Sequence, residues 1–293
     1  MLFVRAIACL LVCLQASVVG LCANATTYQV VVPQDVIDDY HRLVGSRDAH
    51  ELKRYSGKGA RRDVIELLLI RQALARVNPD IRLELKPMRS YQAILEDVAS
   101  GKYIMAATSV WLSDAESIPD AFWVTEPVIR QGTFEAGFYA SSTNYKALKV
   151  NTLEELQQLR AVTNQHWQPD WDTLNGLGIT NVRDIRSWES IVRLLASHRV
   201  DITLAPFNSR PNMAIVMDGC TLVPIPNLKT SLVGERAFVV SRVHPDGQRF
   251  FDSLQQGLRE LEAAGTIQRA YRECGFINPK VRDWKLLNAG LGN

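Results

Sequence analysis

Three segments combine polar and aromatic side chains that can hold a small molecule, and each follows a β-rich run of residues. They contain Thr108 and Trp111, then Asn164, His166 and Trp167, and finally Phe207, Asn208 and Arg210. Open α/β sheets bind ligands beyond the carboxyl ends of their strands. The helix expected after Trp167 adds free backbone N–H groups that favour an anion. We therefore take these eight residues as candidate ligand contacts, while packing of the aromatic rings in the core remains the structural alternative.

The residue patterns of familiar catalytic sites are absent from the sequence. There is no His-x-x-x-His, no Cys-x-x-Cys, no Gly-x-Ser-x-Gly and no Gly-x-x-x-x-Gly-Lys. These are the spacings typical of metal centres, hydrolase nucleophiles and phosphate loops. We therefore expect no metal, no cofactor and no enzymatic activity. The net charge of +2 is too small for a basic nucleic-acid-binding surface, so a nucleic-acid partner is not expected either.

The first 25 residues have the organisation of a cleaved secretory signal. Arg5 precedes the apolar run Ala6 to Leu21, and Ala23-Asn24-Ala25 supplies small residues at positions −3 and −1 of a cleavage site. A membrane anchor is the alternative, although the run is short for a span. Export leaves Cys220 and Cys274, and two thiols in an oxidising compartment suggest one disulfide. Two separate buried thiols remain the alternative.

Short β-rich runs alternate with amphipathic helical runs, which is typical of βαβ units and a mostly parallel sheet. The pattern predicts a first strand at 28–32, a polar stretch from 33 to 59 and a helix that begins at Asp63 and ends before Pro79. It also predicts two C-terminal helices, at 248–264 and 266–273.

Three landmarks resemble family 3 of the extracellular solute-binding proteins. Val124-Thr125-Glu126-Pro127 resembles an aromatic-Ser-Asp-Pro turn, and His198-Arg199-Val200-Asp201 resembles a Gly-Arg-Val-Asp element. The segment from Ala264 to Phe276 resembles a C-terminal Asp-Gly-Thr…Tyr…Phe-Gly element. The resemblance covers nearly all of residues 28–276.

This resemblance implies a two-lobed α/β fold of the type II periplasmic-binding-protein kind. It has two mixed sheets flanked by helices, two crossover strands and a ligand held between the lobes. Residues 26–140 and 232–293 would form the first lobe, and residues 141–231 the second. The implied protein is a periplasmic monomer that binds a small ligand for an ABC-type permease or a membrane sensor.

The sequence departs from the family where amino-acid-binding members grip their ligand. The region from Thr108 to Glu116 lacks the Arg that pairs with the ligand carboxylate, and Pro206 stands where an Asp would hold the ammonium. Arg210 is a possible replacement, whereas Arg61 and Arg62 are expected on a solvated face. We therefore expect recognition through rings and neutral dipoles, and no ordinary α-amino acid as ligand.

Two other functions remain open at this stage. The first is an enzyme on the same fold, similar to periplasmic dehydratases, with Glu126 or Asp170 as general acid. Asp170 is equally consistent with a charge that favours the N-terminus of a helix. The second is a protein-interaction module that no longer binds a small molecule.

Overall fold

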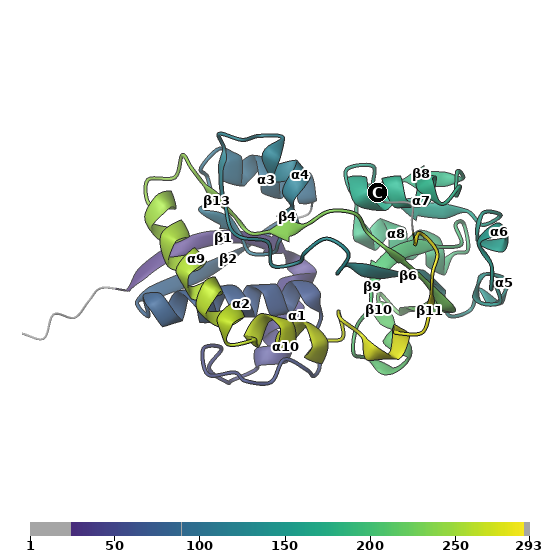
Figure 1. Ribbon diagram of the computed structural model, residues 1–293, viewed down its shortest axis with the longest axis horizontal. Coiled ribbons are helices and arrows are strands. Elements are labelled where there is room, and N and C mark those ends of the chain that lie inside the picture. Colours follow the sequence, from purple (N-terminus) through teal and green to yellow (C-terminus); the bar gives the residue numbers. More distant parts are fainter. Residues whose placement is uncertain (1–24, 89, 290–293) are drawn as a thin grey trace, which may run out of the picture.

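The computed structural model describes residues 25–88 and 90–289, which form two lobes that lie side by side (Figure 1). The expected signal peptide, residues 1–25, lies outside the described residues except for Ala25. Among the helices that are described, none has the length and apolar character needed to cross a membrane.

The first lobe is built on a five-stranded mixed sheet. Its strands, in spatial order, are β2 (Ile81–Met88), β1 (Thr26–Pro33), β3 (Met105–Ala106), β13 (Val239–Ser241) and β5 (Phe122–Val124). β1 pairs in parallel with β2 and β3, whereas β13 runs antiparallel to β3 and β5. Successive side chains of a strand point to opposite faces. Val30 and Val32 accordingly enter one hydrophobic core and Val31 enters another, so both faces of the sheet are covered.

Helices cover the two faces of this sheet. They are α1 (Gln34–Val44), α2 (Arg62–Val77), α3 (Tyr91–Ala99), α4 (Leu112–Glu116), α9 (Gly247–Ala263) and α10 (Thr266–Glu273). Figure 1 shows α3 and α4 above the sheet and α2 and α10 below it, while α9 runs obliquely from the upper left down towards α10. α9 approaches α2 closely at Gly257, where an added Cβ would lie 2.0 Å from the carbonyl oxygen of Ala73. A residue without a side chain is therefore required at this crossing.

The second lobe has a five-stranded sheet, whose main path of four strands is antiparallel and whose fifth strand is β14 (Lys285–Leu286), and a smaller two-stranded one. The larger sheet has the order β10 (Ile215–Met217), β11 (Cys220–Ser231), β6 (Glu135–Ser141) and β9 (Thr203–Pro206). The smaller sheet pairs β7 (Ala161–Thr163) with β8 (Val182–Asp184) in parallel. The helices of this lobe are α5 (Tyr145–Leu148), α6 (Leu153–Leu156), α7 (Gln168–Gly176), α8 (Trp188–Ala196) and the 3₁₀ turn η1 (Pro211–Met213).

Two segments cross between the lobes next to a short ladder. β4 (Val110–Trp111) pairs with β12 (Arg236–Ala237), and the backbone N–H of Leu232 donates to the Phe134 carbonyl at 2.9 Å. β6 hydrogen-bonds to β9 and β11, so the larger sheet of the second lobe begins at Glu135, although the sequence placed residues up to 140 in the first lobe. The predicted two-lobed α/β architecture is confirmed.

The C-terminal segment also returns to the second lobe. It follows α10 through the 3₁₀ turn η2 (Pro279–Val281) to β14 (Lys285–Leu286), which pairs in parallel with β11. The Trp284 ring stands perpendicular to the Phe207 ring at a centroid distance of 5.5 Å. We call residues 279–289 the C-terminal strap.

Two expectations from the sequence are wrong. The stretch from 33 to 59 is not simply polar, because it contains α1, whose buried face carries Val36, Tyr40 and Leu43 at helical spacing among charged residues. The disulfide is not formed, because Cys220 and Cys274 are both free thiols. Cys274 is buried in the main core, whereas Cys220 opens β11 at the edge of a different hydrophobic cluster.

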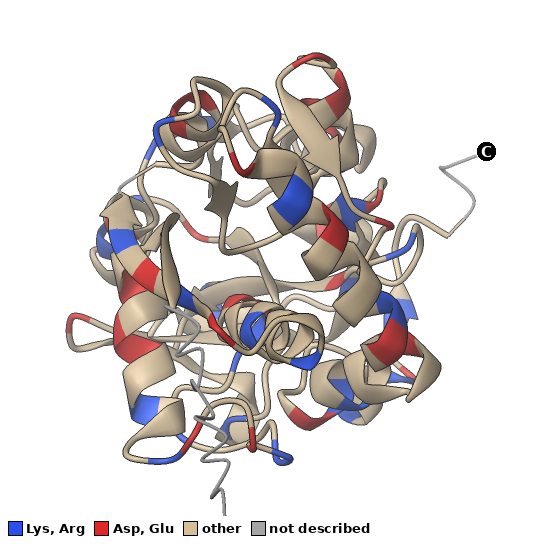
Figure 2. Ribbon diagram, turned by 90° about the vertical axis from the view of Figure 1, so that its left-hand side faces the viewer, with Lys and Arg blue, Asp and Glu red and all other residues tan. Residues whose placement is uncertain are grey.

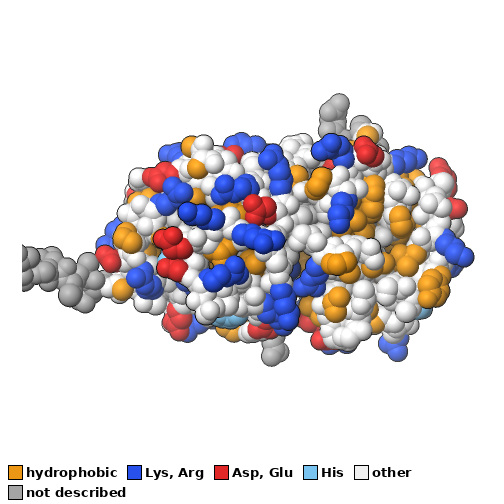
Figure 3. Space-filling model, turned by 90° about the horizontal axis from the view of Figure 1, so that it is seen from below, with side chains coloured by type: hydrophobic (Ala, Val, Ile, Leu, Met, Phe, Trp, Pro, Cys, Tyr) orange, Lys and Arg blue, Asp and Glu red, His pale blue; other side chains and the backbone are white. Residues whose placement is uncertain are grey.

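Charges are distributed unevenly over the surface. Acidic and basic residues interleave along the helices of the first lobe when it is viewed end-on (Figure 2). From below, Lys and Arg side chains gather on the first lobe, and hydrophobic side chains are more frequent on the second (Figure 3).

Candidate functional site

A group of charged and aromatic residues lies where the two lobes meet, and we call it the interlobe cluster. Its first-lobe members come from α2, β4, β12 and the adjoining segments, and Asp170 comes from α7 of the second lobe. The members are Arg62, Asp63, Glu66, Ser109, Trp111, Phe134, Asp170 and Arg236.

Arg236 is buried and has its polar partners on Ser109. Its Nε donates to the Ser109 hydroxyl at 3.0 Å, its Nη2 donates to the Ser109 carbonyl, and its guanidinium lies 4.6 Å from the centre of the Trp111 ring. Glu66, fully buried, accepts from the Ser109 amide at 2.8 Å and from the Ser109 hydroxyl at 2.7 Å. Burial and the nearby Arg62 guanidinium lower the pKa of Arg236. This network holds a cation beside an aromatic ring, an arrangement that stabilises the buried charge.

Arg62 has hydrogen-bonding capacity that the protein does not use. Its Nη2 donates to Asp63, and its guanidinium lies 5.1 Å from the centre of the Phe134 ring. Its Nε and Nη1 are buried and have no hydrogen-bond partner. Unsatisfied buried N–H groups are rare in folded proteins because each loses its hydration. Arg62 is therefore a donor that can bind an incoming acceptor.

Two carboxyl groups of the cluster, Asp63 and Asp170, differ in the direction in which their pKa is shifted. Burial acts to raise the pKa of Asp63, but Arg62, Arg61 and Arg236 together hold it below its ordinary value. Asp170 is half-buried, and burial raises its pKa to about 7 against the attraction of Arg236 and Arg62. No ion pair in the described part of the chain includes Asp170. It is thus a carboxyl group that changes its protonation near neutral pH.

A second charged group lies along the same junction. Arg61 binds Asp35 at 2.6 Å and Asp39 at 2.9 Å, and Arg210 of the second lobe lies 4.0 Å from Asp39. Glu189, at the start of α8, is close enough to Asp35 to help raise the pKa of that carboxyl, after the larger effect of burial. Arg210 and Glu189 thus bring second-lobe charges to the first lobe.

Some residues predicted from the sequence lie at this junction. Trp111 packs on Arg236 and against Phe134, with 5.4 Å between the ring centres, and Thr108 is buried next to Ser109. Arg210 contacts the first lobe through Asp39. Nothing in these contacts shows a ligand, so their assignment as binding residues stays a prediction.

The other residues predicted to bind a ligand make contacts that hold the loops of the second lobe in place. The Asn164 amide donates to the Arg186 carbonyl at 3.1 Å and its oxygen accepts from the His166 amide at 2.9 Å, which fixes the turn before α7. His166 is exposed and Trp167 is half-buried at the start of that helix.

Phe207 and Asn208 lie in the loop that follows β9. The Phe207 ring is buried in a small core with Met213 and Val281. Asn208 donates to the Met213 carbonyl at 2.9 Å and accepts from the Arg210 amide at 3.0 Å. These contacts hold the loop that carries Arg210.

Sequence reasoning missed Arg62 and Arg236. Arg61 and Arg62 were expected on a solvated face, but their side chains are only 25% and 11% exposed. The expectation that Arg61 and Arg62 lie on a solvated face is therefore wrong, whereas recognition through rings and neutral dipoles stays a prediction. Arg236 follows Glu235 and directly precedes the apolar run Ala237 to Val240, and a charge at the start of a buried strand is a signal that could have been recognised.

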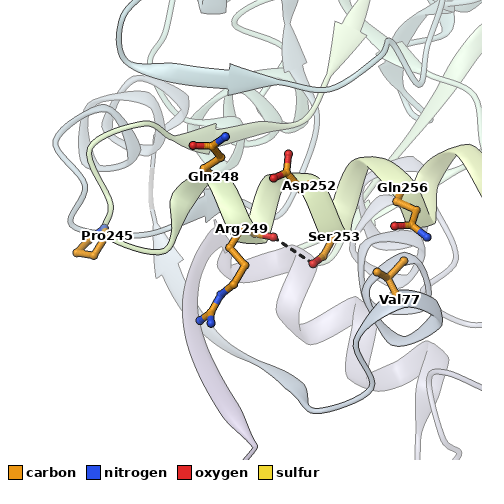
Figure 4. A pocket seen from close by; sticks show the side chains of 7 residues that line it. All are labelled: Val77, Pro245, Gln248, Arg249, Asp252, Ser253 and Gln256. Atoms are coloured by element: carbon orange, nitrogen blue, oxygen red, sulfur yellow. Dashed lines mark hydrogen bonds between the residues drawn. The ribbon is translucent and has the colours of Figure 1, made fainter.

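Other parts of the described structure are weaker candidates for a binding site. No group of three or more His, Cys, Asp or Glu there could hold a metal ion. Two open hollows run along α9, and one of them is lined by seven residues around Arg249 and Ser253, whose hydroxyl donates to the Arg249 carbonyl at 3.1 Å (Figure 4). Their linings come from the first lobe only, so the interlobe cluster is the candidate site.

No protein-family model and no curated protein sequence matches the chain. Solved structures do match it. A probable amino-acid ABC transporter extracellular-binding protein, ytmK of Bacillus subtilis, has a TM-score of 0.53 and 15% identity, over 85% of this chain and 97% of that one. An ancestral amino-acid-binding protein, AncCDT-1, described as a precursor of cyclohexadienyl dehydratase, has a TM-score of 0.51 and 13% identity, over 84% of this chain and 93% of that one.

A periplasmic domain of a longer protein shares the same architecture. The BvgS periplasmic domain of B. pertussis has a TM-score of 0.53 and 13% identity, over 84% of this chain and 43% of that one. At these identities the similarity establishes the fold. The chain thus has the two-lobed fold of the type II periplasmic binding proteins.

Proposed function

We propose that the protein is a periplasmic solute-binding protein, a divergent member of family 3, that captures a small molecule at the interlobe cluster. The observation that carries this proposal is Arg62, whose Nε and Nη1 are buried without partners. Arg236 is close enough to Arg62 to have its pKa lowered by it, and both cations act to lower the pKa of Asp170 of the other lobe. A ligand that presents acceptors to Arg62 would satisfy these groups, and the Trp111 and Phe134 rings would pack against its apolar part.

The lobes are expected to close around this ligand by hinge motion. Strand pairing supports limits at residues 26–134 plus 232–278 for the first lobe and 135–231 for the second, with the C-terminal strap on the second lobe. The ligand would then be held between rigid bodies.

Thermal unfolding in the presence of small molecules tests this proposal. A ligand above its dissociation constant raises the melting temperature, so we expect at least one compound from a panel of carboxylic acids, amino acids, amines and neutral polar molecules to do so. Arg62→Gln should abolish the rise. Arg130→Gln, which changes an exposed arginine, should keep it. No shift with any compound, or an unchanged shift in Arg62→Gln, would contradict the proposal.

We propose that the loaded protein, a monomer in the periplasm, delivers its ligand to an ABC-type permease or presents it to a membrane sensor. The ABC transporter binding protein among the structural neighbours supports the transport version, and the likeness to the BvgS periplasmic domain is compatible with a different membrane partner. In-cell cross-linking followed by identification of the membrane partner distinguishes them. A permease would indicate transport, a sensor kinase would indicate signalling, and a periplasmic enzyme as the sole partner would contradict both.

One observation favours a second candidate, an enzyme that uses acid–base chemistry. A carboxyl group with a pKa near 7 is suited to act as a general acid at neutral pH, and Asp170 is such a group. Conversion of a compound that stabilises the protein, abolished in Asp170→Asn, would establish this candidate. Recovery of the compound unchanged after long incubation would exclude it for that compound.

A further inference from the structure

Two segments that are far apart in the sequence are rich in basic residues. Residues 41–60, at the end of α1 and in the loop that follows it, contain five Lys or Arg and two Asp or Glu. Residues 265–289, which include α10 and the C-terminal strap, contain the same numbers. In the rest of the chain acidic residues outnumber basic ones, although the net charge of the whole is +2. Positive charge is therefore concentrated on these two segments.

The two segments lie against each other in the fold. The backbone N–H of Tyr55 donates to the Glu273 carboxylate at 2.7 Å, and the Arg269 guanidinium lies 5.8 Å from the centre of the Tyr55 ring. Figure 3 shows Lys and Arg side chains gathered on the underside of the first lobe. We call the surface of these two segments the basic face. Its exposed cations on α1, the loop and α10 are Arg42, Lys53, Arg54, Lys58, Arg269 and Arg272.

Most of these six cations have no acidic partner. Two of them lie within 4.0 Å of a carboxylate of the described chain: Arg42, at 2.7 Å from Asp39, and Arg269, at 3.9 Å from Glu273. The other four form no ion pair with a described residue, and all four are exposed. Their charged groups are therefore hydrated in the folded protein and can exchange water for anionic groups outside it.

The composition of the basic face favours an anionic membrane surface over a protein as its partner. Protein interfaces are centred on aromatic and apolar anchors, with charges at the rim. The large hydrophobic side chains exposed on the described residues are Ile118, Tyr145, Val216, Val233 and Val243, and none of them belongs to the two segments. Long, flexible Lys and Arg side chains without such anchors suit the mobile phosphate groups of anionic lipids, which require no fixed geometry.

We propose that the basic face binds the anionic phospholipid headgroups of a membrane and so keeps the protein at the membrane surface. Each Lys or Arg near such a surface strengthens binding by about fivefold, and the attraction extends over a Debye length of about 8–10 Å. Lys280 and Arg282 of the C-terminal strap are exposed and extend the face. The proposal goes beyond the proposed function, because it depends neither on the interlobe cluster nor on the ligand. It places the protein on the surface in which a permease or sensor would lie.

Co-sedimentation with lipid vesicles tests the proposal. The chain from Thr26 onwards, which begins at β1 and excludes the apolar leader, is mixed with vesicles of phosphatidylglycerol and phosphatidylcholine in equal parts, or of phosphatidylcholine alone. Wild type should bind the anionic vesicles, dissociate from them as the salt concentration is raised, and not bind the neutral ones. The triple variant Lys53→Gln/Arg54→Gln/Lys58→Gln should bind the anionic vesicles at least tenfold more weakly, because three of the charges are lost.

A matched control removes the same number of charges from the second lobe. Lys146→Gln/Lys149→Gln/Arg183→Gln replaces two lysines and one arginine that are exposed and form no ion pair with a described residue, so it should bind like wild type. Equal weakening in both triple variants, binding of wild type to neutral vesicles, or no binding to anionic ones overturns the proposal. If anionic vesicles are not bound but the basic-face variant loses a cross-linked protein partner, the face is a protein interface and the proposal also fails. Circular dichroism confirms that each variant is folded.

Discussion

Arg62 and Arg236 show that a residue's role at the lobe junction depends on partners far away in the chain. Arg236 meets Ser109 and Trp111, and Arg62 meets Phe134. The family's anchoring positions lack an Arg and an Asp, yet the junction contains both charge types at other positions. The junction therefore offers charged groups as well as aromatic rings to the ligand that we propose.

Asp201, the last residue of the His198-Arg199-Val200-Asp201 landmark, has a structural role. Arg160 donates to its two carboxylate oxygens at 2.8 and 2.9 Å, and the Asn144 amide donates at 3.1 Å. Hydrogen bonding to Arg160 is the main reason that the pKa of Asp201 falls to about 2. The landmark that suggested a ligand-binding family thus contains a residue that connects separate segments of the second lobe by hydrogen bonds.

We predict that Asp201→Asn lowers the free energy of unfolding by about 1–2 kcal/mol at neutral pH, because a charge-assisted pair is lost. The folded-state pKa lies below the ordinary value, so the stabilisation is complete above pH 3.8 and disappears as pH falls towards 2. Urea unfolding of both proteins across this range measures the difference. Asp120→Asn, an exposed control, should behave like wild type, and a difference that persists at the lowest pH would refute the assignment.

At the scale of elements, the contact between α2 and α9 depends on a glycine. We predict that Gly257→Ala destabilises the protein by about 2–3 kcal/mol, because its Cβ would meet the Ala73 carbonyl oxygen at 2.0 Å and the helices must move apart. This exceeds the gain in helix propensity of about 1 kcal/mol. Urea unfolding is the measurement. Gly176→Ala in α7, where no atom lies within 4 Å of the new Cβ, should not destabilise, and equal effects would contradict the packing argument.

The C-terminal strap is an element that joins the lobes in addition to the two crossover segments. Asn288 exchanges hydrogen bonds with the Ser231 backbone at 3.0 and 2.7 Å, and the Ser209 amide donates to the Cys274 carbonyl at 2.9 Å. These contacts tie the end of the chain to β11 and to the loop after β9. The strap therefore limits how the second lobe can turn against the first.

We predict that Trp284→Ala releases this strap. Trp284 is half-buried, so the loss of its contact with Phe207 should lower the free energy of unfolding by about 1–2 kcal/mol, less than for a fully buried ring. Trypsin should then cut faster after Arg282, which is followed by mass spectrometry. Tyr145→Ala, which removes a ring that is 69% exposed, is the control. Unchanged cleavage in Trp284→Ala would show that the strap is held by its backbone pairing alone.

The elements that sequence reasoning found are those with a clear local pattern. The helix expected from Asp63 to Asn78 is α2, and the two expected C-terminal helices are α9 and α10, each within a residue or two. α1 was missed because charged residues alternate with the apolar residues of its buried face. β14 was missed because a strand of two residues is too short to show an alternating pattern. The interlobe cluster was missed for a different reason: its residues are far apart in the sequence and are brought into contact only by the folded arrangement of the lobes.

At the scale of the whole molecule, the two crossover segments place Phe134 and Arg236 at the meeting point of the lobes. α2 delivers Arg62 to this point from the first lobe, and α7 delivers Asp170 from the second. Each lobe thus provides one side of the site, which is the arrangement that a clamp requires. The same arrangement explains why closure and binding should be coupled.

A crystal structure of the protein with the compound that most raises its melting temperature tests this account most directly. The account predicts the compound between the lobes, with an acceptor within hydrogen-bond distance of Arg62 Nε or Nη1. A compound bound elsewhere, such as in the hollows along α9, with the interlobe cluster unchanged, would contradict it.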